Sequence, residues 1–415
     1  MRKVLMTALL VLSVPLAGCK DGTEGAAAPP DPTSTPTQQT PVPPPQTSTV
    51  TELAMSLDLT EASIERLQAA LAAGDITSVD LVEAHLARIA AHDQAGARLN
   101  AIQHPNPNAL AEAAALDAER RASGPRSALH GIVMVIKDNY ETRGLPTTAG
   151  SKTFVDAAFA PDRDAHLVAR LREAGAVFIG KATMHEFAYG ITTVGSAFGA
   201  TRNPYDPTRN PGGSSGGTGS AVAAGYATVG MGSDTCGSIR IPAAQNNLVG
   251  LRGTQGLSSR RGIVPLSSTQ DIGGPLARSV RDLSIVLDAT VGYDEGDPQT
   301  APMQARGAPA FLDSLSERRG ARIGLLTDWL VQDGEDEAVA AVIRKALAEL
   351  AAGSEWTVEE LDSPGLNQAL DRSHDGHLVL IRDFATDIAA YLDANPELGV
   401  AGVAGLLATG DVIAS

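Results

Sequence analysis

The sequence predicts an α/β protein in which a mostly parallel sheet lies between layers of helices. The first observation is the uninterrupted apolar run from Gly131 to Ile136, which is typical of a strand buried on both faces. The second is a helical pattern over 166–173 that precedes another apolar run over 176–179. A strand, a crossover helix and a second strand imply a right-handed parallel unit. Alternating elements of this kind predict the α/β class.

Three helices are expected before this unit. The first, over 59–73, carries apolar residues at helical spacing and ends at Gly74. Thr77 or Ser78 can cap the second helix, because a hydroxyl accepts a hydrogen bond from the first helical turn. The third helix is rich in alanine and runs from about 107 to 121.

A further strand–helix–strand unit is expected towards the end of the chain. Its first strand starts at Arg322, its helix spans 336–351 and its second strand spans 356–361. Of the 415 residues, 43% are hydrophobic but only 4% are aromatic, which suits small side chains packed closely between helices and a sheet. No internal repeat of fixed period is found.

The charge of the chain argues against a nucleic-acid partner. Lys and Arg number 32 and Asp and Glu number 48, so the formal net charge is −16. Because binding to phosphates requires clustered Lys and Arg, and no such cluster is present, we expect no nucleic-acid binding.

The first 19 residues have the pattern of an export signal. Arg2 and Lys3 precede the apolar run Val4–Leu16, which is too short to span a bilayer. The run ends in Leu-Ala-Gly-Cys, which resembles a bacterial lipobox, so residues 1–18 are predicted to be a signal peptide and Cys19 to be lipidated. The alternative is an ordinary signal peptide followed by an incidental cysteine.

A tether is expected to follow, over 19–52. Pro, Thr and Gln dominate residues 20–50, so this stretch cannot bury enough apolar surface to fold. The prediction is an exported bacterial lipoprotein on the periplasmic face of the cell envelope membrane, held there only by its lipid. Cys236 is the single cysteine besides Cys19, so the mature protein is expected to contain no disulfide.

The stretch Gly212–Pro242 carries the chemistry of the chain. It reads GGSSGGTGSAVAAGYATVGMGSDTCGSIRIP, two glycine-rich loops that bear Ser214 and Ser238 and are separated by a short apolar, helix-like segment. Glycine gives up much conformational freedom on folding, but it lets the backbone approach a ligand closely. Lys137 follows the buried run 131–136, at the end of a strand where ligands of parallel sheets tend to lie.

Together these motifs resemble the amidase signature family, whose catalytic triad is serine, serine and lysine. Lys137 matches the family pattern HGIxxxxKDN, Ser214 the first serine of GGSSGG and Ser238 the serine of GSIR. The resemblance implies a mixed, mostly parallel sheet with helices on both faces, and Ser238 as the acylated nucleophile. It also implies that Ser214 is the bridging residue and is preceded by a cis peptide bond. Members nearest in order act on peptide amides and small carboxamides.

The resemblance covers roughly residues 57–415. Family members continue beyond the point that matches residue 415, so 53–415 is expected to be an amidase domain without its C-terminal portion.

Lys137 can act as a base only when its amine is neutral. The ordinary pKa of lysine is near 10.4, and burial can lower it by several units because it disfavours the charged form. Asp138 would oppose this if it paired with Lys137, but adjacent side chains on a strand point to opposite faces. The alternative for Lys137 is a strand-end lysine that reaches solvent.

Backbone N–H groups of Thr235, Cys236, Gly237 and Ser238 are expected to form the oxyanion hole. Cys236 stands where the family often has glycine, and we expect it to be a small residue in a buried turn rather than the nucleophile. A second departure is the sequence that starts at Arg252, which reads Arg-Gly-Thr where Lys-Pro-Thr is usual.

Two further stretches match more loosely. The stretch 180–187 resembles a loop that walls the substrate cleft, and 274–279 resembles a structural turn. His185 and His130 are interpreted as a wall residue and a turn residue, with no catalytic duty. The chain lacks a Walker motif, paired carboxylates and metal-spaced histidines, so no cofactor and no metal are expected.

The expected activity is hydrolysis of a small-molecule or peptide carboxamide through an acyl-enzyme on Ser238. Two alternatives stay open. One keeps the fold and makes the chain the glutaminase subunit of a tRNA-dependent amidotransferase, against which the signal peptide argues. The other is a surface lipoprotein that binds amides or peptides without cleaving them.

Overall fold

The computed structural model describes residues 58–316, 320–327, 330, 336–353, 355–362, 365 and 374–411. The predicted signal peptide, Cys19 and the tether therefore lie outside the described residues. The described chain forms two compact units, one over 322–379 and the other made of the residues up to 321 and from 380 onwards. The larger unit contains the predicted site residues.

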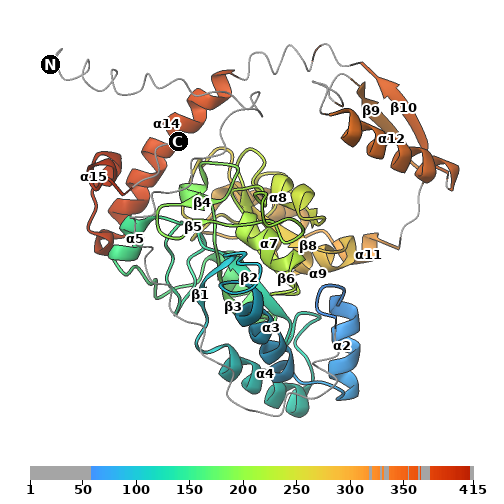
Figure 1. Ribbon diagram of the computed structural model, residues 1–415, viewed down its shortest axis with the longest axis horizontal. Coiled ribbons are helices and arrows are strands. Elements are labelled where there is room, and N and C mark those ends of the chain that lie inside the picture. The colour runs from blue at the N-terminus through green and yellow to red at the C-terminus, as the bar shows by residue number, and fades with distance from the viewer. Residues whose placement is uncertain are drawn as a thin grey trace. The chain divides into compact units, whose positions relative to one another are not determined.

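A mixed sheet of six strands forms the centre of the described part of the larger unit (Figure 1). β3–β2 and β2–β6 pair in parallel, whereas β1–β3, β6–β8 and β8–β7 pair antiparallel, so four of the six strands run in one direction. This confirms the predicted α/β class with a mostly parallel sheet. In spatial order the strands are β1 (Ile102–Pro105), β3 (Val177–Ala182), β2 (Val133–Lys137), β6 (Val229–Asp234), β8 (Ile272–Ala277) and β7 (Val249–Gly250).

Helices cover both faces of this sheet, and glycines allow them to approach it closely. On one face, a Cβ at Gly230 of β6 would lie 2.5 Å from Thr218 of α7 (Gly216–Ala223). On the other face, a Cβ at Gly273 of β8 would lie 2.7 Å from Leu167 of α6 (His166–Glu173). The segment 274–279, predicted to be a turn, lies largely in strand β8. That prediction was wrong because Gly274 and Pro275 resemble turn residues, whereas here Gly274 makes room for the carbonyl of Leu251.

The predicted N-terminal helices are present with shifted starts. α2 (Ile64–Ala73) begins later than expected, because the Ser63 side chain accepts a hydrogen bond from the Arg66 N–H and caps the helix there. α3 (Ser78–His92) is capped by Thr77, as predicted, in a reciprocal pair of hydrogen bonds with Asp80. α4 spans Ala109–Ser123.

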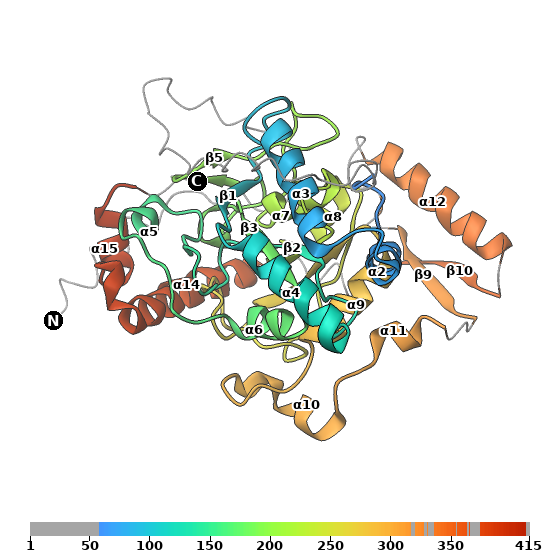
Figure 2. The same ribbon diagram turned by 90° about the horizontal axis from the view of Figure 1, so that it is seen from below.

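The remaining elements of the larger unit connect these parts (Figure 2). They are α5 (Lys152–Asp156), η1 (Glu186–Ala188), β4 (Val194–Gly195), β5 (Gly199–Ala200), α8 (Arg240–Gln245), α9 (Val280–Thr290), η2 (Pro298–Thr300), α10 (Ala301–Arg306), α11 (Phe311–Ser314), η4 (Pro396–Leu398) and α15 (Gly402–Ala408).

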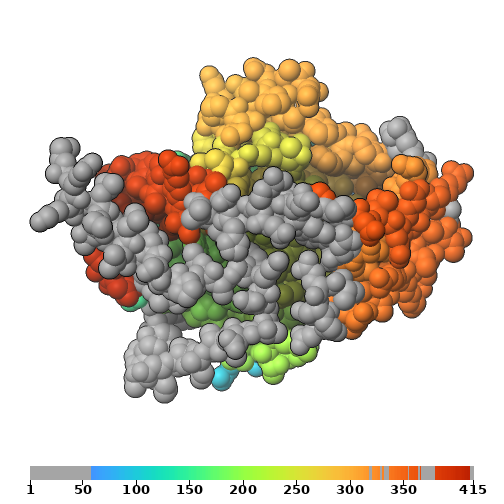
Figure 3. Space-filling view, turned by 90° about the horizontal axis from the view of Figure 1, so that it is seen from above, coloured from blue at the N-terminus to red at the C-terminus, as the bar shows by residue number. Residues whose placement is uncertain are grey.

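A second apolar cluster lies beside the main core of the larger unit. It joins Phe154 and Phe187 to the part of α14 (His374–Ala394) that follows residue 379. The ring of Tyr391 stacks on Phe154 with ring centroids 6.4 Å apart, and the ring centroids of Phe384 and Phe187 lie 5.9 Å apart. The C-terminal segment is coloured red at the surface in Figure 3.

The smaller unit confirms the predicted strand–helix–strand order. β9 (Arg322–Leu326) pairs in parallel with β10 (Thr357–Leu361), and α12 (Glu337–Ala352) connects them. Across the residues described in both units, no helix is long and apolar enough to cross a membrane.

Candidate active site

Lys137 is the last residue of β2 and its side chain is fully buried. Its Nζ lies 2.7 Å from Ser214 Oγ and donates a second hydrogen bond to Ser233 Oγ at 2.8 Å. Asn139 Nδ2 donates to the same Ser233 Oγ at 2.9 Å. The amine is therefore held between hydroxyl groups rather than against a carboxylate.

Burial lowers the pKa of Lys137 to about 7, although the charges of Asp234 and Asp271 act to raise it. Removing an ammonium group from water disfavours its charged form. Near neutral pH a large fraction of Lys137 is thus a neutral amine with a lone pair that can accept a proton.

Asp138 faces away from Lys137 and has partners of its own. Lys181 Nζ lies 3.1 Å from Asp138 Oδ1, and the Thr148 N–H donates to Asp138 Oδ2 at 3.0 Å. Lys181 is itself fully buried and also donates to the carbonyl of Tyr140 at 2.8 Å. The alternation of side chains along the strand thus separates the two neighbouring charges, as expected.

Ser214 lies just before α7, and its backbone is held on both sides. The Gly213–Ser214 peptide bond is cis, which agrees with the family resemblance. The carbonyl of Ser214 accepts a hydrogen bond from the His185 N–H at 3.1 Å. This conformation places the Ser214 hydroxyl against Lys137 Nζ.

Ser238 lies in the turn between β6 and α8 and is only 2% exposed. Its carbonyl accepts a hydrogen bond from the Ser215 N–H at 3.2 Å, which joins the two serine-bearing loops. Among the hydrogen bonds of the described residues, none links Ser238 Oγ directly to Ser214 Oγ. The structure therefore joins Lys137 to Ser214 directly, and Ser238 to that pair through the backbone.

The predicted oxyanion turn differs from expectation at two residues. The Gly237 N–H donates to Asp234 Oδ1 at 2.8 Å, so this donor is already engaged by a carboxylate. Cys236 is exposed rather than buried, because the turn presents its side chain outward. The Thr235 hydroxyl donates to Asp271 Oδ1 at 2.5 Å and anchors the start of the turn.

The family model for amidases matches residues 80–397. The chain belongs to the amidase signature family. A glutamyl-tRNA(Gln) amidotransferase subunit of Chloroflexus aurantiacus is 43% identical over 292 residues, which are 70% of this chain and 58% of that protein. The corresponding amidotransferase subunit from Salinispora arenicola is 39% identical over 317 residues, or 75% of this chain and 63% of that protein. The chain thus spans less than two thirds of these relatives.

Solved amidase structures agree with the fold. The peptide amidase of Stenotrophomonas maltophilia has a TM-score of 0.79 and 38% identity, and the match covers 86% of this chain and 73% of that one. An amidase family protein from Bacillus anthracis has a TM-score of 0.71 and 34% identity, with 83% and 68% covered.

Two residues of this amidase site were missed by sequence reasoning. Ser233 binds the Lys137 amine, and the Asp234 carboxylate accepts backbone N–H groups from the turn that carries Ser238. Both stand directly before the predicted oxyanion donors, so their position in the motif was the available signal. Their roles depend on distances that a linear motif does not contain.

The two histidines near the matched motifs have hydrogen-bond partners in the structure, and that of His185 is Thr192 Oγ1, 3.4 Å from its Nδ1. His130 Nε2 lies 2.9 Å from the carbonyl of Leu116, and His130 is fully buried. Burial, together with the nearby charge of Lys137, lowers the pKa of His185 to about 4, so this ring is neutral at pH 7.

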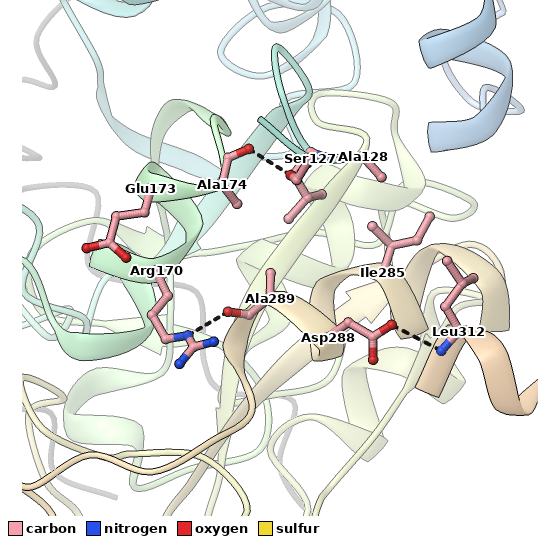
Figure 4. A pocket seen from close by; sticks show the side chains of 10 residues that line it. Ser127, Ala128, Arg170, Glu173, Ala174, Ile285, Asp288, Ala289 and Leu312 are labelled. Carbon is pink, nitrogen blue, oxygen red and sulfur yellow. Dashed lines mark hydrogen bonds between the residues drawn. The ribbon is translucent and has the colours of Figure 1, made fainter. Parts of the chain in front are cut away.

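A cavity of about 460 Å³ lies apart from the amidase motifs (Figure 4). Two of its charged side chains have partners, because Arg170 donates to the carbonyl of Ala289 and Asp288 accepts the Leu312 N–H. Ser127 likewise donates to Ala174, as the dashed lines show. Lys137, Ser214 and Ser238 do not line this cavity, so we do not assign it to the candidate reaction.

Proposed function

We propose that this chain is an amidase that hydrolyses the carboxamide bond of a small molecule or peptide through an acyl-enzyme on Ser238. The observation that carries the proposal is the fully buried Lys137 amine 2.7 Å from Ser214 Oγ, with its pKa lowered to about 7. A base poised near neutral pH beside a hydroxyl is the arrangement that a serine nucleophile needs when no histidine serves.

The reaction proceeds by transfer of one proton along the three residues. As Ser238 Oγ attacks the amide carbon, its proton passes to Ser214 Oγ, and the Ser214 proton passes to Lys137 Nζ. Collapse of the tetrahedral intermediate breaks the C–N bond, and the same path returns the proton to the leaving ammonia or amine. Water then attacks the acyl-enzyme in the same way and releases the acid.

The developing oxyanion is stabilised by backbone N–H groups of the turn 235–238. The Gly237 N–H is held by the Asp234 carboxylate, so this donor must leave Asp234 before it can bind the oxyanion. A donor of this kind is worth roughly 10²–10³ in rate.

A glutaminase role is the second candidate, because amidotransferase subunits are among the similar proteins, one of them at 43% identity. The two roles differ in substrate and in protein partners. A glutaminase subunit would release ammonia from glutamine and deliver it within a complex, whereas the proposed enzyme acts alone on other carboxamides.

Active-site labelling tests the proposed function. Purified protein is treated with a fluorophosphonate probe, the modified residue is mapped, and ammonia release is measured on peptide amides, small carboxamides and glutamine. We expect label on Ser238, turnover of non-glutamine amides, and loss of both in Ser238→Ala. Label elsewhere or no turnover on any amide would favour a binding protein, and turnover of glutamine alone would favour the glutaminase.

We also propose that the protein is exported and anchored by a lipid on Cys19. The support is the short apolar run 4–16 that ends in Leu-Ala-Gly-Cys. In cells fed labelled palmitate, the wild-type protein should carry label and sediment with membranes, and Cys19→Ala should lose both properties. Undiminished membrane attachment of the variant would refute the anchor.

A further inference from the structure

The Asp234 carboxylate holds the backbone on both sides of the proposed nucleophile. Its Oδ1 accepts the N–H of Gly237 at 2.8 Å, and its Oδ2 accepts the N–H of Ile239 at 3.0 Å. These residues flank Ser238 in the chain. The orientation of one fully buried carboxylate at the end of β6 therefore sets the conformation of the turn that presents the Ser238 hydroxyl.

Two arginines bind this carboxylate, and they differ in exposure. Arg252 Nη1 donates to Asp234 Oδ1 at 2.9 Å and also to the Asp234 carbonyl, while its Nη2 donates to the carbonyl of Gln270 at 2.8 Å. Arg240 donates to both carboxylate oxygens at 3.2 Å, Nε to Oδ2 and Nη2 to Oδ1, but its side chain is 53% exposed, against 25% for Arg252. Since water screens the exposed pair more strongly, Arg252 is the better anchor.

We propose that Arg252 is a positioning residue of the amidase reaction, because it fixes the Asp234 carboxylate and, through it, the turn that carries Ser238. This inference rests on the proposed function and adds a residue to it. Arg252 also connects two segments that approach the site from different elements, the end of β6 and the residues just before β8.

Asp234 also acts on the base electrostatically. The charged groups that act on Lys137 are Asp234 at the end of β6 and Asp271 before β8, and both favour the protonated amine. His185, after β3, is neutral, and Asp138 at the end of β2 is paired with Lys181. Hydrogen bonds from Arg240 and the Ile239 N–H hold the pKa of Asp234 below its ordinary value although burial raises it, so this charge is present at neutral pH.

Removing the Arg252 cation and removing the Asp234 charge should therefore shift the pKa of Lys137 in opposite directions. Without the Arg252 cation, the negative charge of Asp234 is less compensated and Lys137 is protonated at a higher pH. Without the Asp234 charge, Lys137 loses a group that favours its protonated form and titrates at a lower pH. If Arg252 had a purely structural role, the two variants would not shift the pKa of Lys137 in opposite directions.

The experiment compares four variants by the pH dependence of kcat/KM on a carboxamide. Arg252→Met removes the guanidinium, Arg252→Lys keeps the charge, and Asp234→Asn keeps the shape of the carboxylate. Arg172→Met is the matched control, because Arg172 is also 25% exposed and binds Asp164 through two nitrogens at 2.9 and 3.1 Å.

We expect Arg252→Met to lower kcat by about tenfold to a hundredfold, since misplacement of a reacting group by an ångström can cost that much. The acidic limb of its kcat/KM profile should move to higher pH, whereas the acidic limb of Asp234→Asn should move to lower pH. Arg252→Lys should restore the position of the limb and recover part of kcat. Arg172→Met should behave like the wild type. If Arg252→Met matches Arg172→Met in both kcat and limb, the inference is wrong.

A second measurement does not depend on activity. Hydrogen–deuterium exchange of a peptide that spans 235–241 should be faster in Arg252→Met than in the wild type and in Arg172→Met, because the Gly237 and Ile239 amides lose their fixed acceptor. Unchanged exchange would overturn the role of Arg252 even in a protein without amidase activity. Absence of labelling and turnover in the wild type, with faster exchange in the variant, would instead refute the proposed function alone.

Discussion

Lys137 and Ser214 stand 77 positions apart in the chain, yet Nζ and Oγ are separated by 2.7 Å in the buried interior. The strand β2 ends at the lysine and α7 begins just after the serine, so the packing of that helix against the sheet brings the two groups together. Among the described residues, the amine has hydroxyl and carbonyl neighbours within hydrogen-bond distance and no paired carboxylate, which is why burial has the largest effect on its pKa.

The rate should depend on the protonation of Lys137. Because its pKa is about 7, the amine is charged and inactive well below this pH and becomes a base as the pH rises through it. We expect kcat/KM to increase from pH 5 and to level off above about pH 8. A profile that stays flat between pH 5 and 8 would contradict lysine as the base.

Lys137→Arg should inactivate the enzyme while keeping a cation at this position. A guanidinium is not deprotonated in proteins, so it cannot accept the Ser214 proton. We expect kcat to fall by about 10²–10⁴, the typical contribution of a general base. Thermal unfolding of the variant, followed alongside, distinguishes lost chemistry from lost folding, and an active Lys137→Arg enzyme would exclude the proposed proton path.

Ser233→Ala should weaken the orientation of the base. The change leaves both Lys137 Nζ and Asn139 Nδ2 without their shared acceptor, and an unsatisfied buried donor costs about 1–3 kcal/mol. We expect kcat to decrease and the midpoint of urea unfolding to fall. Ser258→Ala is the control, since this buried hydroxyl binds only the carbonyl of Gly273 at 3.2 Å and should leave kcat unchanged.

Lys181→Met should destabilise the protein more than most single changes. It leaves the fully buried Asp138 carboxylate without its cation, which typically costs about 3–5 kcal/mol. The double variant Asp138→Asn with Lys181→Met should recover part of this loss, because the amide needs no counter-charge. Urea unfolding of the single and double variants measures the effect, and a stable single variant would show that the pair is not energetically coupled.

Gly217→Ala should disturb the contact between α7 and the sheet. A Cβ at this position would lie 2.2 Å from the carbonyl oxygen of Thr183, and such overpacking costs about 1–3 kcal/mol. Gly353→Ala is the control, because the nearest atom to its Cβ would be 3.6 Å away. Lower unfolding midpoints are expected for the first variant only; equal midpoints would mean that α7 can move away without cost.

The elements that sequence predicted best are those with a clear apolar period. The helix over 166–173 was found at its observed limits, and β2 and the unit β9–α12–β10 were found to within a few residues. By contrast β6, with the sequence VGMGSD, and β8, with IGGPLA, have few large apolar residues. Gly230 and Gly273 make room for helices that pack on these strands, which is information that a single strand does not carry.

Prediction of the site from the sequence was limited in the same way. Lys137 and Ser214 are in contact as their motifs implied, but the partners of Asp234 and the outward direction of Cys236 depend on the path of one turn. Arg252 was noticed only as a departure from the family, because its contacts with Asp234 and Gln270 join residues 18 positions away on either side.

Helix α7 has three glycines among its eight residues, a composition that gives an isolated peptide almost no tendency to form a helix. The helical conformation of α7 therefore depends on its packing against the strands. The Ser214 hydroxyl, just before α7, reaches Lys137 only when the helix and the sheet are packed together. Loosening of this junction should abolish turnover before circular dichroism records any loss of secondary structure.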